Sequence, residues 1–544
     1  MTAMAVPARQ RGNPWVILTV LSLGFFMTLL DLTIVNIAIP NMISRLHASL
    51  DDVLWVINAY ALVLAVLLIT FGRLGDLLGQ RTVFFAGVAL FTLASAACGL
   101  APSPGFLIGF RAVQGLGAAM LMPQTLAILT MVFPADRRGA AFGIWGAVAG
   151  VATIAGPTLG GLLVTAFDWR YIFFINVPIG IVVVTLTLFL IPDLRTGRQH
   201  RFDITGVTVA SLALLAICYA LVEGQKYNWG TITSVISIPL LLGVGALLFG
   251  LFLYLQAHRQ DSEPLVPFVL FADRNYSLMN LVSGFIAIGM LGIFLPFSIY
   301  LQSVLGFSAL KAGLTMAPAS VISMFVAPAA GRLSDRVGGK YILMSGLLLF
   351  AAGMGSIAFI AQANSAWFAF LAPQIVAGLG IGCTFAPMTT VAMRNVNPAM
   401  AGAASGVFNT TRQVGTVIGT AGIGALLQNR LAAGFVDQIQ QRTAGLPPAT
   451  RDRLLAGFQA AAKGGLEVGS GQQTSGLDGT IFTHGFVEAM RPTILVPIFF
   501  LVIGSISCLF VKSQAAASTP VEHAGAAPAR SADTSGGLSE SPAG

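Results

Sequence analysis

The sequence predicts an all-α membrane protein that crosses the bilayer many times. Of its 544 residues, 56% are hydrophobic and only 9% are charged, whereas roughly 25% of a soluble domain is charged. Mean hydropathy is +0.83, and apolar runs of about 20 residues, long enough to span a bilayer, recur along the chain. A soluble protein is therefore excluded. The net charge of +8 is spread between the apolar runs, so we expect the lipid bilayer as a partner and no nucleic acid.

Fourteen segments are long and apolar enough to be transmembrane helices. Their predicted bounds are 14–38, 54–72, 83–101, 105–133, 141–166, 172–191, 205–222, 234–255, 276–301, 313–330, 341–361, 367–392, 403–427 and 491–511. Residues 512–544 are rich in Ala, Ser, Pro and Gly and are predicted to be disordered. The polar loop 428–490 contains helical stretches near 430–442 and 451–463. It either caps an outer vestibule or is a tolerated insertion.

The basic residues predict the orientation of the chain. If the N-terminus is cytoplasmic, most Lys and Arg residues fall in cytoplasmic segments, as the positive-inside rule requires. The short outside loops then contain only Arg45, Arg170, Lys226 and Lys311. We therefore expect both termini to lie in the cytoplasm.

Two of the predicted cytoplasmic loops share the pattern G-R-L-x-D-x-x-G-x-[RK], one at residues 72–81 and the other at 331–340. The tripeptide Gly-Leu-Gly also recurs, at 115–117 and at 378–380. These repeats predict two parallel six-helix bundles, an arrangement typical of transporters with a substrate path between the halves. The predicted organisation is a cytoplasmic segment (1–13), a first bundle (14–191), two inserted helices (205–255), and a second bundle (276–511) followed by the tail.

Four stretches carry a resemblance to a known family. They are the loop 72–81, the pattern R-x-x-Q-G-x-G at 111–117, the two glycine patterns at 146–150 and 156–161, and L-D-x-T-I-V-N-x-A-x-P at 30–40. Together they resemble the major facilitator superfamily, and within it the fourteen-span drug:proton antiporters of the quaternary-ammonium-resistance type. The resemblance implies the major facilitator fold and a location in the bacterial inner membrane. It says nothing specific about the substrate.

Asp31 is the one acidic residue placed well inside a predicted span. Buried carboxylates in membranes are costly and usually functional, so we expect Asp31 to face the central cavity. Burial favours the protonated form of a carboxyl and a nearby cation favours the ionised form. Asp31 is therefore the candidate for proton coupling and for attracting a cationic substrate. The alternative is a structural carboxyl that hydrogen-bonds to Thr28 or to a neighbouring helix.

Arg111 is predicted to lie at a similar depth, on the same helical face as Gln114. We expect Arg111 to interact with Asp31 directly or through water, and a change in their separation to load or release the proton. The alternative is a fixed arginine that only tethers helices.

The repeated loops predict conformational latches. In the first loop, Asp76 can accept hydrogen bonds from the N-terminus of a helix or from an arginine. Arg73 and Arg81 add ion pairs, and Gly72 and Gly79 permit a tight turn. In the second loop, Arg332, Asp335 and Lys340 are expected to act in the same way. The alternative is a plain basic loop of the kind that the positive-inside rule demands.

The helix predicted at 141–166 is rich in glycine. The spacings Gly146–Gly150 and Gly156–Gly160 permit close helix approach, and Pro157 is expected to kink the helix. We expect these residues and Gly161 to form a tight, proton-impermeable seam between the halves. The alternative is ordinary packing of small residues.

Other polar residues are candidates for the lining of a cavity. Ser405, Asn409, Arg412 and Thr416 form one polar stripe at helical spacing, and Arg412 is the other basic residue within a span. The stripe either lines the cavity or bonds to another helix. Further candidates are Asn36, Asn58, Tyr60 and Gln114. Glu223 is placed at the outer interface and is interpreted as structural.

The predicted function is proton-coupled efflux of lipophilic, often cationic, drugs or antibiotics by alternating access. We expect no metal site and no cofactor, because the proton gradient supplies the energy. The G-x-x-x-x-G-K-[ST] pattern of an ATP site is not found in the sequence. We also expect a monomer. The alternative keeps the fold and exports an endogenous metabolite, a self-made antibiotic or a lipid. An enzyme is disfavoured because a second buried acid or histidine is missing.

Overall fold

A computed structural model describes residues 13–46, 48, 50–134, 137–192, 203–224, 226–260, 264–442 and 477–512. The first helices are α1 (Pro14–Leu46), α2 (Leu50–Leu78), α3 (Gln80–Gly99), α4 (Pro104–Val132), α5 (Arg138–Ala166), α6 (Tyr171–Phe174) and α7 (Asn176–Leu190). The helices α8 (Ile204–Glu223) and α9 (Ile238–His258) follow. The remaining helices are α10 (Val269–Ala272), α11 (Arg274–Ile299), α12 (Ala309–Val337), α13 (Lys340–Ile360), α14 (Leu371–Gly382), α15 (Phe385–Met393), α16 (Ala401–Arg442) and α18 (Leu477–Cys508).

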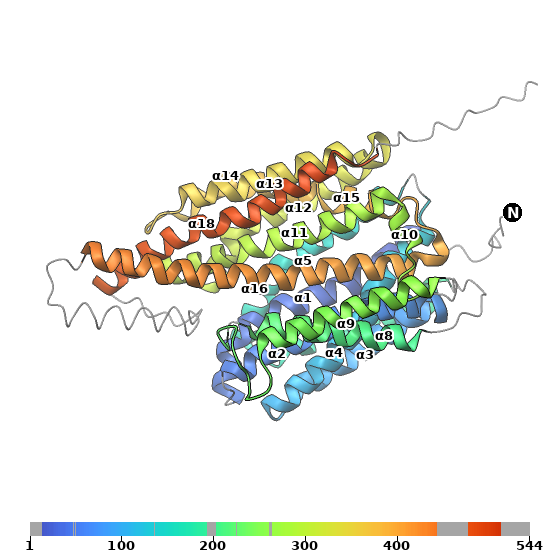
Figure 1. Ribbon diagram of the computed structural model, residues 1–544, viewed down its shortest axis with the longest axis horizontal. Helices are drawn as coiled ribbons and strands as arrows, with labels where there is room; N and C mark the ends of the chain where they lie inside the picture. Colours follow the sequence, from blue (N-terminus) through green and yellow to red (C-terminus); the bar gives the residue numbers. More distant parts are fainter. Residues whose placement is uncertain are drawn as a thin grey trace, which may run out of the picture.

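The helices run roughly along the long axis of the molecule (Figure 1). Helices α1–α4 occupy the lower part of the view, and α12, α13, α14 and α18 the upper part. Helices α5 and α16 lie between these groups. A large apolar core includes side chains of both groups, among them Phe25, Phe84, Phe350 and Phe408. The long apolar runs thus become one packed helical bundle.

Polar caps fix where several of these helices begin. The Ser103 hydroxyl accepts a hydrogen bond from the Phe106 amide at 3.4 Å, directly before Pro104 at the start of α4. Asp203 caps α8 by accepting from the Gly206 amide at 2.9 Å. The side chains satisfy backbone donors that have no partner within the helix. They therefore fix the starts of α4 and α8.

Twelve helical segments in the described part of the chain are long and apolar enough to cross a membrane. The other two predicted spans, 141–166 and 403–427, fall on α5 and α16, which are long helices outside that group. Polar residues such as Asn409, Arg412 and Gln413 dilute the apolar character of α16. A count of fourteen spans therefore stays a prediction.

Two predicted spans are interrupted. The segment 172–191 divides into α6 and α7, and 367–392 divides into a 3₁₀ turn (Trp367–Phe370), α14 and α15. Pro178 and Pro387 stand just after the breaks, and proline has no N–H with which to continue the helical hydrogen bonds. These residues explain why an apolar run did not give one continuous helix.

The predicted outside loop 428–490 is shorter than expected. Helix α16 continues to Arg442 and α18 begins at Leu477, so both project beyond their neighbours (Figure 1). The projecting parts pack on each other through Phe435 and Phe482, whose rings are 5.9 Å apart. The predicted helix at 430–442 is confirmed. The predicted stretch 451–463, the segment 1–12 and the tail after Lys512 lie outside the described residues.

The two inserted helices cover a boundary within the bundle. Helix α8 packs against both α2 and α16 through an apolar cluster that includes Val66, Ala210, Leu214 and Val407. At the end of the α8–α9 pair, Arg259 donates to Asp203 at 2.9 Å. The pair therefore sits across a contact between the N-terminal and C-terminal helices.

Candidate functional site

A buried polar cluster surrounds Asp31 of α1. Asp31 is 0% exposed and forms an ion pair with Arg111 of α4, which is 1% exposed. Gln114 donates to the other carboxylate oxygen at 3.0 Å, and Asn176 of α7 donates to that oxygen at 3.4 Å. The contact that the sequence predicted between Asp31 and Arg111 is present, and it is direct.

The guanidinium of Arg111 is held from three further directions. Its Nη1 donates to the Gln114 side chain at 2.8 Å, and its Nε donates to the Val56 carbonyl at 2.9 Å. The group also stacks over the Tyr60 ring, 4.3 Å from the ring centre. These contacts offset the cost of burying the cation. Tyr60 and Gln114, predicted as cavity residues, instead belong to this enclosed cluster.

The expectation that Asp31 faces an open cavity is wrong for this conformation. All of its partners come from the N-terminal helices, and water does not reach its carboxylate. The physical reason is that one cation and two side-chain amides replace hydration. Sequence analysis missed Ser95 and Asn176 as members of the cluster. Ser95 accepts from Gln114 and from Asn176, each at 3.1 Å. A polar residue inside an apolar span was the available signal for both.

Asp76 closes a contact between the two halves of the chain. Its two oxygens accept hydrogen bonds from the Gly402 and Ala403 amides, both at 2.8 Å. These amides form the first turn of α16, where a helix attracts negative charge. Gln80 donates to the same carboxylate at 3.1 Å, and Arg73 lies 3.9 Å from it. Gly72 packs directly on the start of α16, where a Cβ would lie 2.6 Å from the Gly402 carbonyl.

The second loop repeats this arrangement in the opposite direction. Asp335 of α12 accepts from the Gly139 amide at 2.8 Å and from the Ala140 amide at 3.0 Å, in the first turn of α5. Each half therefore caps a helix of the other half. Gly79 and Gly338 end the two motif helices with φ of 93° and 85°, a conformation that glycine adopts without strain.

The last basic residue of each loop makes an equivalent contact in its own half of the chain. Arg81 donates to the Leu188 carbonyl near the end of α7 at 2.5 Å, and Lys340 donates to the Leu509 carbonyl just after α18 at 2.7 Å. One predicted residue differs, because Arg332 is exposed and has no ion pair among the described residues. Its position on the outer side of α12 leaves it in reach of solvent instead.

The predicted seam divides into two parts. Near its beginning, α5 packs on α12, where Cβ atoms on Gly143 and Gly150 would lie 2.6 Å and 3.1 Å from the Ala327 and Ser320 carbonyls. Gly146 faces Phe385 at 3.6 Å. Further along, Gly156 packs against Thr33 of α1, within the N-terminal half. A Cβ added to Gly161 would meet no described atom of another element within 4 Å.

The seam prediction is therefore wrong for Gly156 and Gly161, because a helix presents its successive glycines to different neighbours. Gly160 is buried. The side chain of Pro157 lies outside the described part of the structure.

The polar stripe of α16 is separate from the Asp31 cluster and from the two caps. Asn409 is 2% exposed, donates to the Ser405 carbonyl at 2.9 Å, and accepts from the half-buried Arg412 at 3.0 Å. The Ser405 hydroxyl donates to the Pro123 carbonyl of α4 at 2.7 Å. The stripe thus both bonds to another helix and leaves Arg412 partly accessible.

One of the other cavity candidates, Asn58, and Glu223 can also be placed. Asn58 is half-buried on α2. The side chain of Asn36 lies outside the described residues. Glu223 is buried and lies 3.7 Å from Lys226, an ion pair at the end of α8 that agrees with a structural role.

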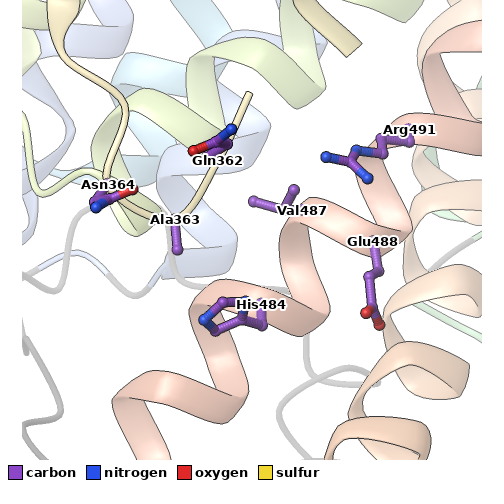
Figure 2. Close-up of a pocket in the computed structure, with 7 residues that line it drawn as sticks. All are labelled: Gln362, Ala363, Asn364, His484, Val487, Glu488 and Arg491. Atoms are coloured by element: carbon purple, nitrogen blue, oxygen red, sulfur yellow. The ribbon is translucent and has the colours of Figure 1, made fainter. Parts of the chain in front are cut away.

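A separate cavity of about 550 Å³ lies between the segment after α13 and the N-terminal half of α18. Its lining residues are Gln362, Ala363, Asn364, His484, Val487, Glu488 and Arg491 (Figure 2). Figure 2 shows Arg491 pointing toward the Gln362 segment and Glu488 pointing away from it. Glu488 accepts from Gln438 at 2.9 Å. None of the predicted site residues lines this cavity.

Known proteins resemble this chain in fold and in sequence. The family model described as Major Facilitator Superfamily matches residues 21–420. The multidrug resistance protein Stp of Mycobacterium tuberculosis (strain CDC 1551 / Oshkosh) is 36% identical over 77% of this chain and 77% of its own length. The tetracenomycin C resistance and export protein of Streptomyces glaucescens is 35% identical over 79% of this chain and 78% of its own. The human organic anion transporter MFSD10 superimposes with a TM-score of 0.55, at 14% identity, over 90% of this chain and 99% of that one.

The two helical halves, joined by reciprocal caps, and the relatives named above identify a multi-pass membrane transporter. The chain belongs to the Major Facilitator Superfamily. Its fold is that of the family, and its activity is transport rather than enzymatic catalysis.

Proposed function

We propose that this protein is a proton-coupled exporter of lipophilic compounds. The observation that carries the proposal is the enclosed Asp31–Arg111 pair, a carboxylate placed where its protonation changes the local charge. The names of two relatives, a multidrug resistance protein and an antibiotic resistance and export protein, support a drug or antibiotic as the cargo. Bacterial relatives and the pattern of basic loops support the bacterial inner membrane, with both termini cytoplasmic.

The proton step follows from the contacts of Asp31. When Asp31 is ionised, it holds Arg111 by charge and accepts from Gln114 and Asn176. Protonation removes that charge, so Arg111 keeps only its bonds to Gln114 and to the Val56 carbonyl. The Arg111 cation then lacks a balancing negative charge in a region of low dielectric constant. This cost favours movement of α1 relative to α4. Return of the proton to water on the other side restores the pair. The energy source is the proton gradient, and no cofactor takes part.

The two caps supply the gate. Opening the end of the bundle that contains Asp76 and Asp335 breaks four backbone hydrogen bonds, two at the start of α16 and two at the start of α5. The close contacts of Gly143 and Gly150 with α12 separate in the same movement. We assign this closed end to the cytoplasmic side, so the conformation corresponds to an outward-facing stage of alternating access by a monomer.

A second candidate keeps the mechanism and changes the cargo to a metabolite made by the same cell. The name of the Streptomyces relative, a resistance and export protein for tetracenomycin C, favours it. Two observations would support this candidate over drug efflux. The protein would export a dye but give its original host no drug resistance, and deletion of its gene would stop secretion of a product of the cell.

The test uses everted membrane vesicles from a host that lacks its own pumps. Rhodamine 123, a cation, and fluorescein, an anion built on the same ring system, are supplied outside with an acidic vesicle interior. We expect uptake of at least one dye above empty-vector vesicles, abolished by a protonophore. Uptake that survives the protonophore, or that matches empty vesicles for both dyes, contradicts the proposal.

A further inference from the structure

Arg412 is a cation in the middle of the bundle, and among the described residues it has no carboxylate as a partner. It lies eleven residues after Ala401, the first residue of α16, which is about 16 Å along the helix, near the middle of a hydrocarbon core about 30 Å thick. Among the described residues its one hydrogen bond is to the Asn409 side chain, and it forms no ion pair. Buried or membrane-embedded charges normally have partners, so this arginine lacks the counter-charge that its position calls for.

The direction of Arg412 follows from the other faces of α16. Gly402 and Gly406 pack on α2, and Gly415 and Gly419 pack on Gly284 and Ile288 of α11. Gly402 and Gly406 therefore mark the face toward α2. Gly419 lies two turns after Arg412 on the same stripe, so that stripe runs alongside α11, a helix of the C-terminal half.

Ile418 and Ser405 show which sides of α16 face outward and inward. Ile418 is 44% exposed and marks the outer face. Ser405 lies two turns before Arg412 on the same stripe, and its hydroxyl bonds to the Pro123 carbonyl of α4. The stripe therefore points inward, toward the boundary between the two halves, where transporter substrates bind.

Asp31, the acidic residue predicted to attract a cationic substrate, is not available for binding at that boundary. Asp31 is completely buried and its charge is balanced by Arg111. In the described part of the chain, the charge left at mid-depth is the half-buried guanidinium of Arg412, which donates a hydrogen bond to Asn409. The electrostatic character of the boundary is thus positive rather than negative.

We propose that Arg412 is the substrate-binding cation of this transporter, and that its preferred cargo is a lipophilic compound with an anionic group such as a carboxylate or a phenolate. The inference rests on the proposed export function and changes the cationic preference predicted from the sequence. A guanidinium offers two parallel N–H donors that match a carboxylate. Its one bond to Asn409 leaves other donors for the ligand. The anion supplies the missing counter-charge, and the rest of the compound contacts apolar side chains.

The experiment compares fluorescein and rhodamine 123 in the same everted vesicles. Wild-type protein is expected to take up fluorescein in preference to rhodamine 123. Arg412→Gln is expected to weaken fluorescein binding to the purified protein by at least about tenfold, the loss expected for one charge-assisted hydrogen bond. Rhodamine 123 is unaffected or binds better. Arg412→Lys keeps the charge and is expected to retain most of the fluorescein affinity.

Arg430→Gln is the matched control, because Arg430 is exposed and lies on the same helix, beyond the polar stripe. Preference of the wild type for rhodamine 123, or an equal loss of both dyes in Arg412→Gln, overturns the inference. In the first case the export function survives, since proton-dependent uptake of rhodamine 123 is still seen. Absence of proton-dependent uptake of either dye contradicts both proposals.

Discussion

Asp31 and Arg111 lie 80 residues apart in the sequence and form a buried ion pair between α1 and α4. The pair is enclosed by Gln114, Asn176 and Tyr60, so its two charges depend on each other for compensation. This dependence makes the pair both a structural element and a candidate proton switch. Measurements of stability and of transport separate the two roles.

The stability of the pair is tested by a double-mutant cycle. Asp31→Asn leaves Arg111 as an unpaired buried cation, and Arg111→Gln leaves Asp31 as an unpaired buried anion. Each single variant is expected to lose about 3–5 kcal/mol of unfolding free energy, whereas Asp31→Asn/Arg111→Gln loses much less than the sum. Chemical unfolding in detergent, followed by tryptophan fluorescence, measures all four proteins. Additive losses would show that the two charges do not depend on each other.

The caps are tested by neutralising one acceptor at a time. Asp76→Asn and Asp335→Asn each weaken two hydrogen bonds to backbone amides. The loss in free energy of the closed gate is expected to be about 1 kcal/mol per cap. This loss shifts the equilibrium between closed and open gate roughly fivefold toward the open state. A cysteine placed at Ser405, fully buried just behind the Asp76 cap, reports opening through its reaction with a polar maleimide. The background protein has its four native cysteines replaced.

Faster labelling in both variants is the expected result, with the larger effect in the double variant. Because Arg332 is exposed and has no ion pair among the described residues, Arg332→Gln is the matched control and should label at the wild-type rate. Equal labelling of all variants contradicts the gating role of the caps.

The helix contact of α5 with α12 is tested by adding single methyl groups. Gly143→Ala places a Cβ 2.6 Å from the Ala327 carbonyl, which the contact cannot accept without separation of the backbones. We expect export to fall several-fold. Gly161→Ala has open space around its new Cβ and is expected to leave dye uptake unchanged. If the two variants behave alike, close approach at Gly143 is not needed for transport.

The sequence predicted the main contacts better than the details of their surroundings. The repeated loop pattern predicted that Asp76 and Asp335 accept hydrogen bonds from a helix N-terminus or from an arginine, and in the structure both cap a helix N-terminus. Depth along two helices predicted the contact of Asp31 with Arg111. The particular amides of Gly402 and Gly139 were not predictable, because backbone donors have no signature in the amino-acid sequence.

Other errors have a common physical cause. The glycines of α5 follow one another in the sequence, yet Gly143 meets α12 and Gly156 meets α1. A pattern shows that a helix can be approached closely but does not show by which neighbour. Ser95 and Asn176 were missed for a related reason, since one polar residue in an apolar span does not reveal its partner. The enclosure of Asp31 became visible only with these partners in place.

The central claim is that Asp31 carries the coupling proton. The most direct measurement is dye uptake into everted vesicles as a function of an imposed pH difference, for the wild type and for Asp31→Asn at matched protein content and with dye binding verified. The proposal predicts that uptake by the wild type rises with an acidic interior, while the variant binds dye but shows no response to the gradient. Full gradient-driven uptake by Asp31→Asn would contradict it.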